Sequence, residues 1–466
     1  MEFSFHQIES AAYVAGAIAF AWVVMVSRFD VHRRLSVVGT AFLTLTLLHG
    51  VSAIPYVMGV IPSDTYNPPT PLSRYFVPVL SISFVCFALG AWTTGSLLNF
   101  NLRNMQQEYF SSLPSRGRLN AYMFLLLSAG IIVLAVLFAY GAGKPGFVAL
   151  VDDFRNGRIL KEHRQDFYES NPYAWAGAFA TGVVGPLVLL TSINLARGTK
   201  SAAFRVYLVG LFCLLALAGT SGLHKAPLPL LVLFIAMNWH FSRVSTREQQ
   251  TGGKIWLIGA VVMGTIVTGG YLLTYDLDLS EAVLSTVSRI FLSPQACLNR
   301  YLFVYPDIVP HANGLGIGLI AKIAGDHNFV SPAVVVGSVV STSEFRISSN
   351  AFWAADLWAN FGYLGVAIGS LAVGAIMVFL DWWSLRRPRT AANMAEYAFL
   401  VTVGLRVLNA SIFTGLLSGG LLFAPVYALA VQMTLIRRQQ TTRPARSQGA
   451  DSPGEAARHA AVESGP

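Results

Sequence analysis

Apolar stretches of roughly 17 to 25 residues recur along nearly the whole chain, and they limit its fold more than any other feature of the sequence. Each stretch is long enough to cross a hydrocarbon core of about 30 Å as a helix. Segments such as MFLLLSAGIIVLAVLFAY are apolar on every face, whereas the strands of a membrane barrel alternate apolar and polar residues. We therefore predict an all-α, polytopic integral membrane protein.

The composition supports this class of protein. Of the 466 residues, 54% are hydrophobic and 12% are charged, whereas a soluble domain carries about 25% charged residues. Hydropathy predicts about eleven transmembrane helices, with ends placed to within about two to four residues. The predicted spans are 10–27, 35–53, 75–98, 120–141, 173–195, 206–222, 226–241, 255–275, 360–382, 395–413 and 418–436.

The distribution of charge predicts the orientation of the chain. An N-terminus outside and a C-terminus in the cytoplasm make every second loop basic and put most of the 32 lysines and arginines inside. This pattern is typical of multi-pass proteins of the cytoplasmic-membrane type. The net charge of +9 then follows from topology, and no nucleic-acid partner is expected. The N-terminal MEFSFHQIES lacks the basic segment of a cleavable signal peptide, so the first apolar stretch is interpreted as a span.

The loops and the tail give the domain organisation. Residues 1–438 are predicted to form a transmembrane domain, and residues 439–466, poor in large apolar side chains, a disordered cytoplasmic tail. Two large outer loops, at about 142–172 and 276–359, are basic and rich in aromatic residues. The second contains an apolar pattern of helical spacing, interrupted at Pro294, which predicts two short helices at the outer interface.

Basic residues of the outer loops have no topological role, so they are candidates for binding an anionic substrate. Arg155, Arg158 and Arg164 either pair with neighbouring carboxylates or bind a diphosphate through their guanidinium groups. Lys225, at an outer turn, is either a solvated lysine or a phosphate ligand.

Three further arginines are candidate binding residues. Arg289 and Arg300 lie about three helical turns apart, so an unbroken helix would place them on similar faces, and neither has a carboxylate nearby in sequence. Arg406 falls inside the predicted tenth span, where an arginine costs about 2.5 to 3.5 kcal/mol. It either pairs with a buried acceptor or binds an anionic lipid-linked substrate.

Acid–base chemistry on the outer side requires histidines or carboxylates tuned to neutral pH. His311, Asp356 and Glu344 are the candidates for this role. The three cysteines lie far apart, and no histidine, cysteine or carboxylate spacing matches a metal site. We therefore expect neither a metal nor another cofactor.

One segment resembles a known family. SSNAFWAADLWANFGYLGVAIG, which leads from the long outer loop into a span, is similar to the corresponding segment of bacterial O-antigen and exopolysaccharide polymerases, the oligosaccharide repeat-unit polymerases. SRIFLSPQACLNRYLFVYPDIVPHANGLG and GTSGLHKAPLPLLVLF also resemble that family, so the likeness covers about 140–380. The resemblance assigns site roles to Arg289, Arg300, His311 and Arg346 in the long loop, and to Asn350, Asp356 and Asn360 in the segment leading into the ninth span.

The resemblance implies a function. An undecaprenyl-diphosphate-linked oligosaccharide would be extended on the outer face of the membrane, within membrane lipid and without a nucleotide sugar. A chain-length regulator and a flippase are the expected protein partners. Two alternatives stay open: an O-antigen ligase or another polyprenol-dependent glycosyltransferase, and, from a different class, a membrane transporter.

Overall fold

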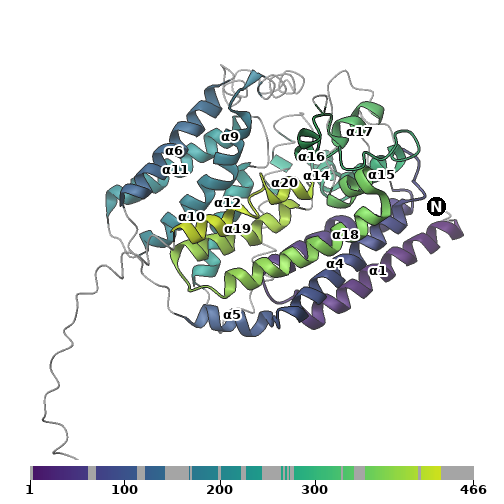
Figure 1. Cartoon of the computed structure of the whole chain (residues 1–466), viewed down its shortest axis with the longest axis horizontal. Coiled ribbons are helices and arrows are strands. Elements are labelled where there is room, and N and C mark those ends of the chain that lie inside the picture. The colour runs from purple at the N-terminus through teal and green to yellow at the C-terminus, as the bar shows by residue number, and fades with distance from the viewer. Residues whose placement is uncertain are drawn as a thin grey trace, which may run out of the picture.

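The computed structural model describes most of the chain between residues 4 and 431, and the described residues form helices and no strand (Figure 1). The all-α prediction is therefore confirmed for this part of the chain. The described residues are 4–60, 70–112, 121–141, 167, 170–197, 201–221, 227–243, 264–265, 268–269, 272, 278–326, 329–340, 352–407 and 411–431.

Six helices within these ranges are long and apolar enough to cross a membrane, which is compatible with a membrane-embedded protein. Two of them combine consecutive elements, because a π-helical turn lies between α2 and α3 and another lies between α9 and α10. The six are Phe5–Phe29 (α1), Val37–Val57 (α2, η1 and α3), Phe76–Leu97 (α4), Ala174–Ala196 (α9, η2 and α10), Ala202–Thr220 (α11) and Trp353–Leu385 (α18).

Other helices coincide with further predicted spans without meeting the same criteria of length and hydropathy. They are α6 (Ala121–Tyr140), α12 (Pro227–Arg243), α19 (Ala391–Val407) and the helical residues 423–431, which follow the short α20 (Ile412–Leu416). The predicted span 255–275 lies almost entirely outside the described residues, as does the predicted tail 439–466. The number of spans stays a prediction.

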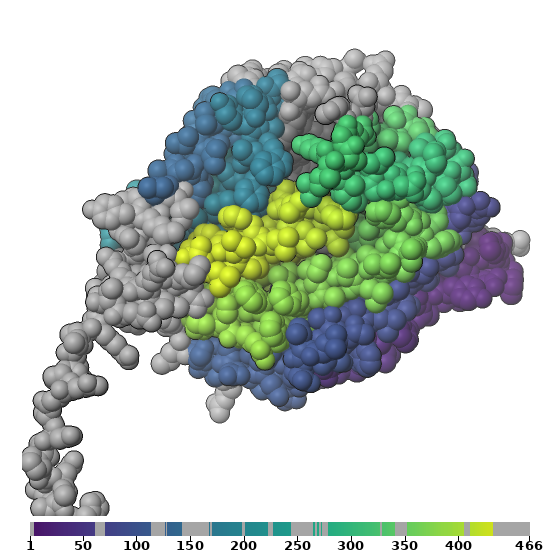
Figure 2. All heavy atoms as spheres, in the orientation of Figure 1, coloured from purple at the N-terminus to yellow at the C-terminus, as the bar shows by residue number. Residues whose placement is uncertain are grey.

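Helix packing divides the bundle into two parts joined by α19 (Figures 1 and 2). On one side, α4 packs along both α18 and α1, and on the other, α10 and α11 pack together. Helix α19 contacts α2 of the first part and both α10 and α12 of the second. The α4–α18 contact is especially close, since a Cβ atom on Gly90 would lie 2.0 Å from the carbonyl oxygen of Leu371. Small residues permit such close helix packing in membranes.

Short helices gather at the two opposite ends of the bundle, which we call the α15 end and the α5 end (Figure 1). The α5 end carries α5 (Leu102–Ser111), whose N-terminus is capped by the side chain of Asn101. The α15 end carries α14 (Leu279–Val287), α15 (Ser293–Val304), α16 (Gly318–Ile323) and α17 (Pro332–Val340).

The chain is not broken at Pro294 into two separate helices. A π-helical turn, Ser288–Leu292 (η4), connects α14 directly to α15, and Pro294 lies in the first turn of α15. Proline has no N–H to donate and its ring clashes with the preceding turn of a regular helix, and the wider turn before Pro294 relieves this conflict. The sequence pattern is therefore helical throughout 279–304, with the proline accommodated by a wider turn.

Candidate functional site

Helix α18 is broken near the α15 end, and the break shapes the candidate site. Gly362 has φ +61° and ψ −147°, a conformation open mainly to glycine, and it separates a leading helix, residues 353–361, from the long remainder of α18. A Cβ atom on Gly362 would lie 3.3 Å from Nε2 of His311. The leading helix is therefore not a straight continuation of the rest of α18, and its side chains are positioned separately from those of the longer part.

Asp356 lies on this leading helix and is half-buried. Its Oδ2 atom accepts a hydrogen bond of 2.8 Å from the hydroxyl of Ser411, which begins α20. The carboxylate also lies close enough to Tyr301 and Tyr305 for its charge to act on both hydroxyls. Three segments distant in sequence thus meet at one carboxylate.

The two tyrosines have altered acidity. Burial first, and then the negative charge of Asp356, raises the pKa of Tyr305 to about 12. Burial likewise raises the pKa of Tyr301 well above its ordinary value, with the charge of Asp356 the second cause. Both phenols are thus buried within range of the charge of Asp356, which disfavours their ionised form.

Asn360 holds the loop before α16 against the leading helix. Its Oδ1 atom accepts a hydrogen bond of 3.0 Å from the backbone N–H of Gly316, and its Nδ2 donates to the carbonyl of Asp356 at 2.9 Å. A backbone bond of 2.9 Å from Ala312 to Ala359 runs beside it. Asn360 is fully buried and both of its amide atoms make hydrogen bonds, so it positions this loop, and the substrate contact expected from the sequence stays a prediction.

His311 lies in an aromatic cluster next to the break in α18. Its ring lies 6.4 Å from that of Tyr305, nearly parallel to it, and 5.3 Å from that of Trp358, edge to face. Its Nδ1 atom is buried and makes no hydrogen bond within the described part of the chain. The imidazole is held by ring packing, which fixes its place without using this nitrogen.

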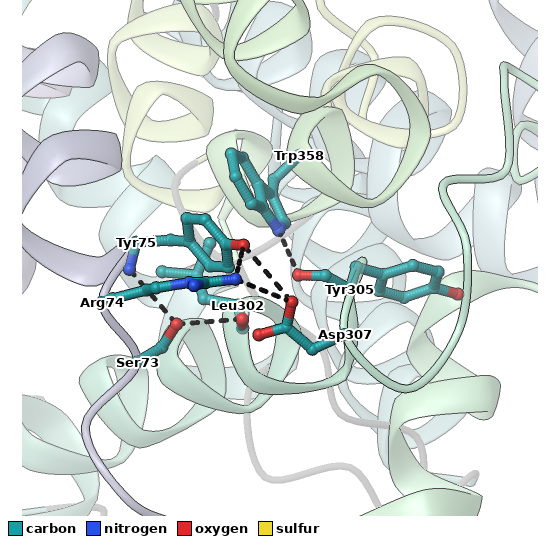
Figure 3. A network of polar contacts seen from close by, with 7 residues as sticks. All are labelled: Ser73, Arg74, Tyr75, Leu302, Tyr305, Asp307 and Trp358. Carbon is teal, nitrogen blue, oxygen red and sulfur yellow. Dashed lines mark hydrogen bonds and ion pairs between the residues drawn. The ribbon is translucent and has the colours of Figure 1, made fainter.

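A polar network ties the start of α4 to this region (Figure 3). Trp358 donates from Nε1 to the carbonyl of Tyr305 at 2.8 Å, and Ser73 donates to the carbonyl of Leu302 at 2.9 Å. Nearer the solvent, Arg74 forms an ion pair of 3.2 Å with Asp307 and also bonds the hydroxyl of Tyr75. The bonds made by Trp358 and Ser73 fix the end of α15, and with it Tyr301 and Tyr305, relative to the leading helix, whereas the exposed ion pair lies at the edge of the network.

The structure does not place Arg289 and Arg300 on similar faces. Arg289 is exposed, whereas Arg300 is 6% exposed and its charge acts on Tyr56, at the end of α3. Arg289 lies within the π-helical turn Ser288–Leu292, so the regular helical spacing on which the sequence prediction rests does not hold between the two residues. Their different exposure follows this irregularity.

The remaining predicted site residues fall outside the described part of the chain. Arg406 belongs to α19, but its side chain is outside the described residues. The others are Arg155, Arg158, Arg164, Lys225, Glu344, Arg346 and Asn350.

Sequence reasoning missed a buried histidine close to this site. His49 lies in the π-helical turn Thr46–Val51 (η1), is 1% exposed, and stacks on Phe352 with ring centroids 4.1 Å apart. Gln295 of α15 donates to the carbonyl of Leu48 at 2.7 Å, so the irregular turn is held from the α15 end. The signal was available, because an ionisable residue inside an apolar stretch is a candidate functional residue by default.

A second polar centre lies at the α5 end, also unpredicted. The carboxylate of Asp381 is fully buried and accepts hydrogen bonds of 2.9 Å from the N–H groups of both Val37 and Val38, which begin α2. Tyr397 donates to it at 3.2 Å. The neighbouring Glu396 pairs with Arg387. These groups join α2, α18 and α19, which is a structural role.

Comparison of the chain with protein-family models, with curated proteins and with solved structures found no match. The family likeness therefore rests on the sequence segments named above, and the function has to be argued from the chemistry of the α15 end.

Proposed function

We propose that this chain is a membrane glycosyltransferase that polymerises undecaprenyl-diphosphate-linked oligosaccharide repeat units into O-antigen or exopolysaccharide. It acts on the outer face of the bacterial inner membrane, with about eleven spans, the N-terminus outside and the C-terminus in the cytoplasm. The α15 end is then the outer end. Reporter fusions after residues 250 and 320 test this orientation: the first should read cytoplasmic and the second extracytoplasmic, and the same reading from both would reject it.

The observation that carries the proposal is the surroundings of Asp356. The residue comes from the segment that resembles the polymerases. Its carboxylate accepts a hydrogen bond from Ser411, and its charge acts on Tyr301 and Tyr305. One of its oxygens is used by Ser411, and the residue keeps part of its surface exposed. A positioned carboxylate of this kind is suited to act as a general base.

The chemistry follows from these groups. Asp356 takes the proton of an acceptor sugar hydroxyl as the hydroxyl oxygen forms a bond to the anomeric carbon of the donor glycan. The bond between that carbon and the donor diphosphate breaks, and the electron pair leaves with the lipid diphosphate. Arg289 is exposed at the same end and is the described arginine suited to stabilise this leaving group.

The direct test is Asp356→Asn, which keeps the shape of the side chain and removes the base. General-base catalysis contributes about 10²- to 10⁴-fold, so polymer should fall by at least about 100-fold, leaving single repeat units on the carrier lipid. The matched control is Asp307→Asn, a carboxylate at the same end that is paired with Arg74 outside the proposed site. Polymer ladders of wild-type length from a normally inserted Asp356→Asn protein would reject the proposal.

The same assay distinguishes the alternatives. Loss of an O-antigen ligase leaves long polymer on the carrier lipid, whereas loss of a polymerase leaves single units. Loss of a transporter would give neither of these two glycan patterns. It would instead abolish the uptake or efflux of a solute, and that transport would depend on Arg406, the charged residue within the predicted tenth span.

A further inference from the structure

Two π-helical turns from distant parts of the chain contact each other at the α15 end. They are η1, Thr46–Val51, and η4, Ser288–Leu292, and α15 contacts η1 as well. Turns of this kind widen a helix locally and are frequent at functional sites. Because η4 carries Arg289, the contact links η1 to a residue of the proposed reaction.

Gln295, in the first turn of α15, makes the polar part of this contact. The residue is fully buried, and its Nε2 atom donates hydrogen bonds of 2.7 Å both to the carbonyl of Leu48 and to the hydroxyl of Ser52. Ser52 itself donates to the carbonyl of Leu48 at 2.6 Å. That carbonyl therefore already has a partner on its own side of the contact, and what Gln295 adds is a bond between α15 and η1.

The amide of Gln295 is a costly way to fill this space. Its Oε1 atom is buried and makes no hydrogen bond to the described residues, and a buried acceptor without a partner is unfavourable. A leucine of similar size would avoid that cost and would leave the carbonyl of Leu48 bonded to Ser52. Stability alone therefore does not explain an amide at this position.

The turn η1 also contacts the start of α18. His49 is 1% exposed and stacks on Phe352, with ring centroids 4.1 Å apart and the ring planes inclined by 26°. Phe352 is fully buried and immediately precedes the leading helix, which carries Asp356 about one turn further along. The place of Asp356 therefore depends on η1 through this ring contact.

We propose that Gln295 and His49 are positioning residues that act through η1, which joins the segment carrying Arg289 to the helix carrying Asp356. The inference rests on the proposed function, in which these two residues act on one substrate. Gln295 holds α15 against η1, and His49 holds η1 against the leading helix. A base and a leaving-group arginine on separate segments need a fixed separation, and a misplacement of about 1 Å can slow a reaction about 100-fold.

The test is the rate of polymer formation by the purified full chain, with lipid-linked single repeat units isolated from cells that lack the polymerase as substrate. Gln295→Leu keeps the volume and removes both bonds to η1, so kcat should fall about 10- to 100-fold while KM for the repeat unit changes little. Gln295→Met removes the same donor with an unbranched side chain and should behave alike, so it replaces Gln295→Leu if that variant is not inserted. The matched control is Ser83→Ala in α4, which also removes a buried hydrogen bond, of 2.7 Å to the carbonyl of Val79, and should keep the wild-type kcat.

His49 is tested by the ring that it contributes. His49→Leu should lower kcat as Gln295→Leu does, whereas His49→Phe retains a ring to stack on Phe352 and should restore most of the rate. If both residues act through η1, the double variant Gln295→Leu/His49→Leu should lose little more than the more impaired single variant. Losses that multiply would show that the two residues act separately and would overturn the shared role of η1.

The remaining outcomes reject the positioning role or the reaction itself. A wild-type kcat in Gln295→Leu, a change confined to KM, or an equal loss in Ser83→Ala would each overturn the proposal. Asp356→Asn in the same assay separates the two hypotheses. Wild-type polymer from Asp356→Asn rejects the catalytic function, whereas a normal rate from Gln295→Leu beside an inactive Asp356→Asn rejects the positioning alone.

Discussion

Helix α18 carries an aspartate near each of its ends, and the two have opposite surroundings. Asp381, at the α5 end, is fully buried and receives three hydrogen bonds, two of them from the first N–H groups of α2. Asp356, at the α15 end, is half-buried and receives a hydrogen bond from Ser411. A buried carboxylate that accepts several hydrogen bonds from the protein serves the fold, whereas one with a single such bond at a partly exposed residue is the better candidate to act on another molecule.

The largest effect on stability is expected at Asp381. Asp381→Ala leaves the N–H groups of Val37 and Val38 buried without an acceptor, so it should destabilise the protein by about 3 to 5 kcal/mol. Chemical unfolding in detergent and the amount inserted in membranes measure this. If Asp381→Ala proves as stable as wild type, the contrast between the two aspartates fails.

Gly362→Ala should have an intermediate effect. Glycine is required there by its positive φ, and a Cβ atom would press on His311, so we expect a loss of about 1 to 3 kcal/mol together with reduced polymer. The same unfolding measurement applies. The control is Gly130→Ala in α6, where a Cβ atom meets nothing within 4 Å and alanine favours the helix. Equal stability of the two variants would show that the break in α18 does not depend on Gly362.

Asp356→Asn should cost less than about 1 kcal/mol of stability, because the amide oxygen still accepts from Ser411. Its effect should appear in polymer synthesis and not in unfolding, opposite to the behaviour of Asp381→Ala. A loss of stability as large as that of Asp381→Ala would give both aspartates the same structural role.

The smallest effect is expected at the ion pair between Arg74 and Asp307. Both side chains are largely exposed, at 73% and 48%, and solvent screens such pairs strongly. Arg74→Ala should leave the unfolding midpoint unchanged within error in both low and high salt. A clear loss at low salt alone would show that the network in Figure 3 fixes α15 more strongly than its exposure indicates.

The helical bundle is largely predictable from the sequence. Hydropathy is averaged over about twenty residues, so a local irregularity in the helix leaves the average unchanged. The predicted spans 75–98 and 173–195 coincide with Phe76–Leu97 and Ala174–Ala196. The π-helical turns are not predictable in this way. A wider turn changes the hydrogen-bond register without changing the apolar content, and at η4 it alters which way Arg289 faces.

The candidate site is predictable only in part. Asp356 was a candidate as an outer carboxylate, but its partner Ser411 lies 55 residues further along and carries no local signal. Nothing in the sequence indicated that the side chain of Asn360 would accept a hydrogen bond from Gly316 and donate one to the carbonyl of Asp356. Such pairings depend on tertiary packing, whereas sequence periodicity reports on one element at a time.

The break at Gly362 has a mechanical consequence. Membranes differ in thickness, and a long helix adapts to them by tilting. In α18 the long part after Gly362 can tilt by rotation about that one residue. The hydrogen bonds of Asn360 and Trp358 meanwhile hold the leading helix against its neighbours. The proposed catalytic end of the chain would then keep its geometry in bilayers of different thickness.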